Sequence, residues 1–421
     1  TPSETRGLSS QKPSSENLEV VIPDGEDFVD IGTLSSRSAF FSIASALLGT
    51  GLSVPYAFGE VGLLPGMVGL SLVVIIVGYG VRMVVLSLSS EKCLQMAVAD
   101  NMPRQNIELS YLALCAYGHR GRIFASVILS MELWFALVVA LVSIGVNGAL
   151  LTHGFLSQRV IIALATLATF PLLDAPAWFL GFAGICSLVG VMICALGFLD
   201  AAVETTPSRI SSEHEPGLLQ EVFRFISAFG ILFYSYGNAA CLPPIRSEME
   251  KTEKFPIVAT LATLFSACFY LLMGFAGGVF GSSIGQSYLA NVTNPAVLTV
   301  ACLAIIIAFM FVMPLMTNPI LLALLPVVKA STPLQISLFK VSFCIVSAAA
   351  AIFLQDYLAA LSSLTGSSLT MLTLVFIPAA IYIRLVPDIS AMEKIALAIV
   401  SLSSLVFVIL GTYVAAVDIF A

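Results

Sequence analysis

Residues 42–58, SIASALLGTGLSVPYAF, interrupt an apolar run with two glycines, a threonine and a proline. A second segment of this kind, ILFYSYGNAACLPPI, covers residues 231–245. An apolar run of about 20 residues is long enough to cross a membrane as a helix, and Gly and Pro in its middle break that helix. The two segments therefore predict two broken membrane helices.

The composition of the whole chain agrees with this prediction. Of the 421 residues 58% are hydrophobic and 10% are charged, and the mean hydropathy is +1.01, whereas soluble proteins carry about 25% charged residues. The 18 Lys and Arg against 25 Asp and Glu give a net charge of −7, which excludes a basic surface for nucleic acid. These numbers exclude soluble enzymes and nucleic-acid binders, and they predict an all-α polytopic membrane protein in a lipid bilayer.

Charge-poor apolar runs predict 11 transmembrane helices. The runs are 38–59, 61–88, 123–152, 160–173, 175–199, 225–245, 255–280, 296–322, 334–354, 358–383 and 395–417. With a cytosolic N-terminus, 15 of the 18 Lys and Arg fall on the cytosolic side, and omission of the short fourth run changes this division to 10 against 8. Because basic residues gather on the cytosolic side, the division favours 11 helices and a cytosolic N-terminus.

The two broken helices also predict the organisation of the chain. Each would begin a set of five helices, and because five is odd the second set must be inverted, with the eleventh helix outside the repeat. The predicted parts are an acidic, disordered cytosolic tail (1–36), the first five-helix repeat (37–200), a non-cytosolic loop (201–221), the second, inverted repeat (222–384), and the eleventh helix with a short C-terminus (385–421). The linker 89–122 is expected to hold a short helix near 106–117. Asn291 lies in a sequon in a predicted non-cytosolic loop and is a candidate for glycosylation.

The chemistry of the breaks indicates a class of ligand. An unwound turn exposes backbone N–H groups on one half-helix and C=O groups on the other. Helix N-termini attract a carboxylate, and exposed carbonyls attract an ammonium group or a cation. Neither break contains a charged side chain, which favours a net-neutral zwitterion. The alternative is that Gly and Pro kink these helices for packing alone.

Glu132 is the only acidic residue well inside a predicted span. It lies ten residues beyond Arg122, which is about 15 Å along an α-helix and near the middle of a hydrocarbon core about 30 Å thick. A carboxyl group at that depth needs a partner or a role, and burial favours its protonated form. Glu132 is therefore a candidate proton carrier or counter-ion for an ammonium group. The alternative is a structural hydrogen bond to a neighbouring helix.

Several short motifs, in their order and spacing, resemble the amino acid/auxin permease family of the amino acid–polyamine–organocation superfamily. They are GTGLSVPYA at 49–57, YGHRGR at 117–122, NAACLP at 238–243 with Met249 and KFP at 254–256, the pair Pro314 and Pro319, and Gly366 with Pro378. The resemblance covers about residues 36–417. It implies an eleven-helix inverted-repeat fold and secondary transport of amino acids by alternating access.

The resemblance also bears on the coupling ion and the site. Sodium-coupled members carry an Asn on the first helix and two Thr residues on the eighth, where this chain has Ser45, Met310 and Val312. Met and Val offer no oxygen to a hard cation, so H+ is favoured over Na+. The candidate substrate-binding residues are Ser45, Gly49, Thr50, Gly51, Tyr234, Gly237 and Asn238.

The sequence thus predicts a secondary active transporter of small neutral amino acids, coupled to protons, in the plasma membrane or a vacuolar or lysosomal membrane. One alternative is a non-transporting amino-acid sensor that signals through its N-terminal tail. Another is a sodium-coupled or auxin-like carrier of the same fold. We expect no catalytic residues, because the hydrolase-like string GSSIG at 281–285 falls in a loop between membrane helices. We expect no metal site, because the chain has no Cys-x-x-Cys pair and no pair of His with metal-ligand spacing. No cofactor is expected. The sequence specifies no oligomeric state.

Overall fold

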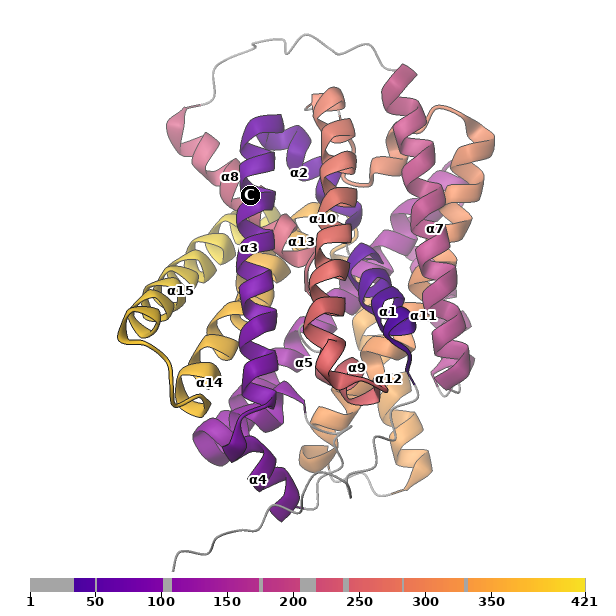
Figure 1. Cartoon of the computed structure of the whole chain (residues 1–421). Helices are drawn as coiled ribbons and strands as arrows, with labels where there is room; N and C mark the ends of the chain where they lie inside the picture. Colours follow the sequence, from indigo (N-terminus) through magenta and orange to yellow (C-terminus); the bar gives the residue numbers. More distant parts are fainter. Residues whose placement is uncertain are drawn as a thin grey trace, which may run out of the picture. The chain divides into compact units, whose positions relative to one another are not determined.

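The structure, a computed structural model, describes residues 34–49, 51–100, 108–173, 177–204, 217–237, 242–281, 284–328 and 332–420. These residues are almost entirely helical (Figure 1). The first predicted break is present, because α1 (Ser36–Gly49) is followed by a short 3-10 turn (Gly51–Ser53) that leads into α2 (Val54–Val61). The two halves of this span are bent by 52° relative to each other.

The second predicted break is also present. It separates α8 (Leu218–Tyr234) from α9 (Leu242–Glu248). The amide of Gly237 donates to the carbonyl of Tyr234 at 2.9 Å, a bond between residues three apart that tightens the end of a helix. Both interruptions thus lie where Gly and Pro interrupt the apolar runs.

The other membrane helices follow the predicted runs. They are α3 (Leu63–Leu88), α5 (Leu109–Leu151), α6 (Gln158–Thr169), α7 (Ala177–Glu204), α10 (Phe255–Phe280), α11 (Pro295–Val328), α12 (Pro333–Phe353) and α15 (Ala391–Phe420). The tenth run is one continuous helical segment. It consists of α13 (Leu358–Leu364), the π-helical turns η8 (Thr365–Thr370) and η9 (Leu372–Phe376), and α14 (Ile377–Leu385).

Six of the described helices are long and apolar enough to cross a membrane, and the bent pair α1 and α2 makes a seventh. Shorter apolar helices are Gln158–Leu172, which is α6 with the 3-10 turn that follows it, Leu188–Val203 within α7 and Pro295–Met310 within α11. The chain is therefore a multi-pass membrane protein. The count of 11 spans and the inverted repeat stay predictions.

The linker after α3 contains two helices. The sequence does not predict α4 (Glu91–Ala99), which starts at Ser90, whose side chain accepts the amide of Cys93 at 3.4 Å, as a helix N-cap does. The short helix expected near 106–117 is the first part of α5. This helix changes direction at Gly118, where φ is 69°, a conformation that glycine adopts readily.

Two predicted boundaries differ by a few residues from the ends of the helices. The loop expected at 201–221 is helical at both ends, because α7 continues to Glu204 and α8 already starts at Leu218. A helix need not stop where its apolar run stops, and the charged Asp200 ends only the run. Of the tail predicted at 1–36, residues 1–33 lie outside the described residues, and α1 begins at Ser36.

Each half of the first broken helix packs against one half of the second. α1 packs against α9, and α2 packs against α8. At one end of the bundle Leu34 and Met249 form a parallel bridge, in which the Leu34 amide donates to the Glu248 carbonyl at 2.8 Å and the Glu250 amide donates to the Leu34 carbonyl at 3.0 Å. α10 packs against both α1 and α2 (Figure 1), so it lies along both halves of the first broken helix.

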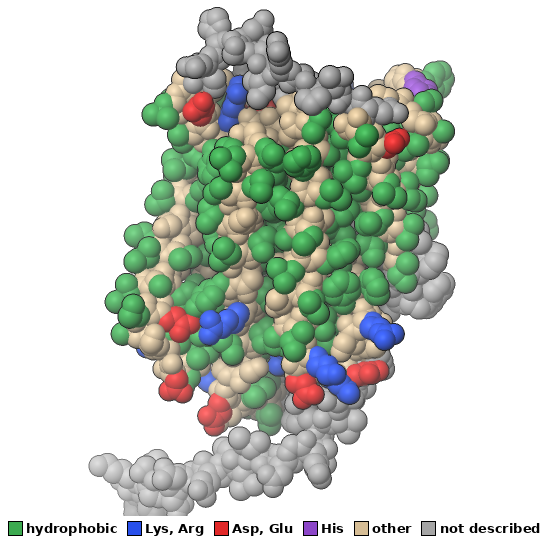
Figure 2. Space-filling view, turned by 45° about the horizontal axis from the view of Figure 1, so that its top comes forward, with side chains coloured by type: hydrophobic (Ala, Val, Ile, Leu, Met, Phe, Trp, Pro, Cys, Tyr) green, Lys and Arg blue, Asp and Glu red, His purple; other side chains and the backbone are tan. Residues whose placement is uncertain are grey.

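The outer surface of the helices is apolar. In Figure 2 hydrophobic side chains cover the middle of the visible face, and charged side chains gather at its two ends. Exposed examples are Leu64, Ile75, Ile257 and Ile399. Lipid can cover such side chains, and the helices satisfy their own backbone groups, as a membrane requires.

Candidate functional site

Tyr270 on α10 lies between the two breaks. Its hydroxyl donates to the carbonyl oxygen of Leu47 near the end of α1, and it lies 3.0 Å from the carbonyl oxygen of Ser235, just after α8. The side chain is fully buried. A methyl group on Gly51 would lie 2.7 Å from the hydroxyl oxygen, so Gly51 leaves the room that the ring occupies. One side chain thus contacts both unwound segments.

Glu132 on α5 reaches the second break. Its side chain is 4% exposed, and its Oε1 has no hydrogen-bond partner among the described residues. A methyl group on Gly237 would lie 3.4 Å from this oxygen and 3.2 Å from Oγ1 of Thr370. The candidate proton carrier and the second unwound segment are therefore neighbours.

The tenth span presents hydroxyl groups to Glu132. The side chains of Thr370 and Thr373 interact with its carboxyl group, and both are fully buried. They belong to η8 and η9, and π-helical turns are rare and frequent at functional sites. Gly366 lets this segment press against α8, since a methyl group there would lie 2.6 Å from the amide nitrogen of Tyr234. Tyr234 itself is buried and interacts electrostatically with Glu132.

The structure describes only some of the remaining predicted substrate-binding residues. Ser45 is partly buried, and its hydroxyl donates to the carbonyl of Ser42 in its own helix at 3.0 Å. Gly49 is the last residue of α1. Thr50 and Asn238 lie outside the described residues. Of the seven predicted residues, Gly51, Tyr234 and Gly237 are those whose contacts at the breaks are defined.

Sequence reasoning missed Tyr270, Thr370 and Thr373. For the two threonines a signal is present, because residues 361–374, LSSLTGSSLTMLTL, place seven hydroxyl side chains in the middle of an apolar span. Tyr270 has no comparable signal. Its contact with both breaks depends on how α10 packs, which local sequence does not encode.

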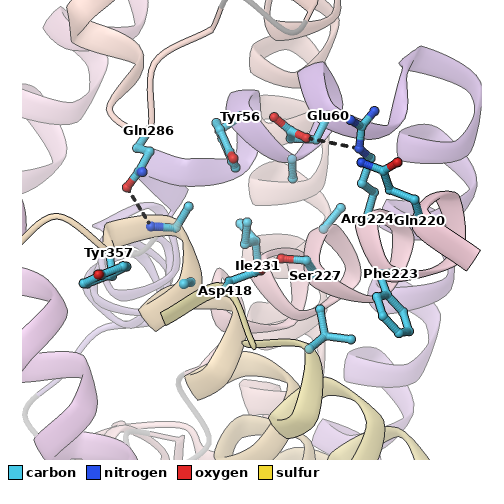
Figure 3. Close-up of a pocket in the computed structure, with 15 residues that line it drawn as sticks. Tyr56, Glu60, Gln220, Phe223, Arg224, Ser227, Ile231, Gln286, Tyr357 and Asp418 are labelled. Atoms are coloured by element: carbon cyan, nitrogen blue, oxygen red, sulfur yellow. Dashed lines mark hydrogen bonds and ion pairs between the residues drawn. The ribbon is translucent and has the colours of Figure 1, made fainter. Parts of the chain in front are cut away.

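A cavity of about 330 Å³ lies beyond the breaks, between α2, α8, α13 and α15 (Figure 3). Tyr56 and Glu60 of α2, Arg224 of α8 and Asp418 of α15 are among its lining residues. Oε2 of Glu60 lies 4.0 Å from Nε of Arg224, which forms an ion pair between the two half-helices. Tyr56 is five residues beyond Gly51, so the cavity adjoins the half-helix that follows the first break.

The loop after α10 holds the predicted glycosylation site. Asn291 ends a 3-10 turn (Tyr288–Asn291), and its Oδ1 accepts the amide of Gly285 at 2.9 Å. Its modification stays a prediction. In the part of the chain that the structure describes, no group of three or more His, Cys, Asp or Glu side chains is placed to hold a metal ion.

Solved membrane transporters share this fold. A manganese transporter from Eremococcus coleocola matches with a TM-score of 0.52 at 11% identity, over 94% of this chain and 88% of that one. Mhp1, a nucleobase-cation-symport-1 family transporter, matches with a TM-score of 0.51 at 15% identity, over 91% of each chain. The broken helices and this likeness define the chain as having the fold of these membrane transporters.

The chain belongs to the family described as transmembrane amino acid transporter protein, whose model matches residues 32–417. The resemblance inferred from the motifs is thereby confirmed. Amino acid transporter ANT1 of Arabidopsis thaliana is 22% identical over 404 residues, which are 90% of this chain and 91% of that protein. Amino acid transporter AVT1E of the same plant is 24% identical over 291 residues, 64% of this chain. The match spans 54% of AVT1E, about half of its length.

Proposed function

We propose that this protein is a secondary active transporter that carries small neutral amino acids together with protons by alternating access. The observation that carries the proposal is the position of Glu132, a buried carboxyl group beside Gly237 in the second break. The half-helix ends suit the carboxylate and the ammonium group of a zwitterion. Tyr270 fills the space next to Gly51, which favours a small substrate.

The coupling follows from the cost of a buried charge. An ionised Glu132 has no cationic side chain among its described interaction partners, and a buried charge without compensation is costly. Closing the site therefore requires a proton on the carboxyl group or an ammonium group close to it. A neutral amino acid and one proton together satisfy this requirement, and the proton gradient then drives accumulation.

Uptake of labelled alanine into proteoliposomes tests the proposal, with proton and sodium gradients applied separately. We expect the proton gradient to drive accumulation and replacement of sodium by choline to change it little. In Glu132→Gln, which fixes the neutral state, accumulation should fall to the level of empty liposomes while exchange of substrate for substrate continues. Glu221→Gln, an exposed acid in the first turn of α8, is the matched control.

Two outcomes contradict the proposal. Proton-driven accumulation in Glu132→Gln equal to that of the unmodified protein would leave Glu132 with a structural role. Binding of alanine without flux under either gradient would instead support an amino-acid sensor.

A further inference from the structure

Two backbone carbonyl groups converge on the hydroxyl of Tyr270. Leu47 lies in the last turn of α1, and Ser235 directly follows α8. Both carbonyls therefore belong to C-terminal ends of half-helices, which carry the negative end of the helix dipole. In transporters with broken helices, such ends and unwound carbonyls coordinate the coupling cation.

Here a hydroxyl hydrogen occupies the point between the carbonyls. The ring of Tyr270 lies against Gly51 and leaves no space there for a side chain. The ring of Tyr236 packs edge-on against it, with 5.4 Å between the ring centroids. The phenol reaches from α10 to both breaks, and its O–H presents the partial positive charge that the two carbonyls face. Because a hydroxyl has one hydrogen, it donates fully to one carbonyl at a time.

We infer that Tyr270 stands in for a coupling cation between the two broken helices and so determines the ion selectivity of the carrier. With the ring in place, a sodium ion has no room between the carbonyls, and the hydroxyl supplies the positive end that links α1 to α8. A small polar residue at position 270 would leave two carbonyl oxygens around an open space. The inference deepens the proposed function and rests on it for its transport readout, but not for its stability readout.

The experiment compares full-length variants in sodium chloride and in choline chloride of equal concentration. Tyr270→Phe removes the hydroxyl and keeps the ring, and Tyr270→Ser removes the ring and offers a small hydroxyl, with Tyr270→Asn as a second small polar variant. Tyr117→Phe is the matched control. The Tyr117 hydroxyl also donates to a backbone carbonyl, that of Ala380, at a distance of 2.8 Å, and this hydrogen bond is not at either break. Thermal stability is measured in detergent, and alanine uptake in proteoliposomes.

We expect the unmodified protein and Tyr117→Phe to be insensitive to sodium in both measurements. Tyr270→Phe should reduce uptake by about fivefold or more in either salt, the effect of losing about one hydrogen bond. Tyr270→Ser or Tyr270→Asn should be stabilised by sodium and should recover uptake by about threefold or more in sodium relative to choline, through the added stabilisation of the bound state.

The inference is overturned if sodium stabilises the unmodified protein, if Tyr270→Phe transports normally, or if neither small variant responds to sodium. The last result would make Tyr270 a structural link only. If the unmodified protein moves no alanine under any gradient, the proposed function fails, while the stability comparison between sodium and choline still decides the role of Tyr270.

Discussion

The two breaks each place a glycine where a larger residue would meet a neighbour, but the neighbours differ. Gly51 leaves space for the buried ring of Tyr270, whereas Gly237 faces the carboxyl group of Glu132 and the hydroxyl of Thr370. At Gly237 an added methyl group would lie 3.1 Å from the carbonyl oxygen of Tyr234 and 3.2 to 3.4 Å from those two oxygens, a milder overlap than at Gly51. A substitution at Gly51 should therefore affect folding, and one at Gly237 should affect the coupling group.

Replacement of Gly51 by Ala is expected to lower thermal stability and abolish alanine uptake, because the methyl group overlaps a fully buried ring. Overpacking of this kind costs about 1–3 kcal/mol. Gly78→Ala on α3 is the control, since it is exposed and nothing lies within 4 Å of a new methyl group. Ala there should leave stability unchanged or raise it by up to about 1 kcal/mol. Equal melting temperatures for both variants would contradict the packing of Tyr270 on Gly51.

Gly237→Ala should fold normally and transport poorly. The methyl group would lie 3.4 Å from Oε1 of Glu132, so we expect a melting temperature close to that of the unmodified protein and a reduced rate of proton-driven alanine uptake. Uptake and melting temperature are measured on the same preparation. Unchanged uptake would argue that substrate and proton do not meet at this break.

At the scale of elements, α2 and α8 are held together at the cavity by the ion pair between Glu60 and Arg224. The side chains are 27% and 44% exposed, and exposed ion pairs contribute about 0–1 kcal/mol. A contact of this strength breaks easily, so under the proposed alternating access the two half-helices could separate at little cost.

Reversing one charge of the pair should favour the separated state. Glu60→Arg or Arg224→Glu places like charges together, and the double variant restores the attraction with opposite polarity. Ser227, which lines the cavity, serves as a reporter when changed to Cys in a cysteine-free background. We expect the rate of labelling by a membrane-impermeant maleimide to rise in each single variant. In the double variant the rate should fall back to that of the protein with the original Glu60–Arg224 pair. Equal rates in all four proteins would rule out a role of the pair in opening.

The elements were more predictable than their contacts. Gly and Pro in apolar runs predict both breaks because they act on the local backbone, and the depth of Glu132 follows from counting residues along a helix. The rotation that turns Glu132 toward Gly237 could not be predicted, because a lone acidic residue does not reveal which neighbour its helix face meets. α4 was missed since its N-cap at Ser90 lies in a polar linker without apolar periodicity. The contacts of Tyr270 are set by packing across three helices.

At the scale of the whole molecule, the bridge between Leu34 and Met249 bears on topology. Leu34 is hydrogen-bonded to both neighbours of Met249, so the two residues lie on the same side of a membrane and an even number of spans must separate them. The segments between them are the bent pair α1 and α2, then α3, α5, α6, α7, and the broken pair α8 and α9. That number is even when the short helix α6 counts as a span, which supports the prediction of 11.

Cysteine labelling can test this topology. The eight native cysteines are replaced, and single cysteines are introduced at Arg37, Glu253 and Ala290. An impermeant reagent should label Arg37→Cys and Glu253→Cys from one side of the membrane, and Ala290→Cys from the other. Labelling of Arg37→Cys and Glu253→Cys from opposite sides would contradict both the bridge and the count.

The same bridge has a mechanical consequence. α1 and α9 come from different predicted repeats, yet their outer ends share backbone hydrogen bonds through Leu34. Two separate half-helices could swing apart one after the other and leave the site open to both sides for a moment. Under the proposed alternating access, two ends joined in this way would move as one unit, with one hinge motion instead of two. A leak at this end would then require the bridge to break first.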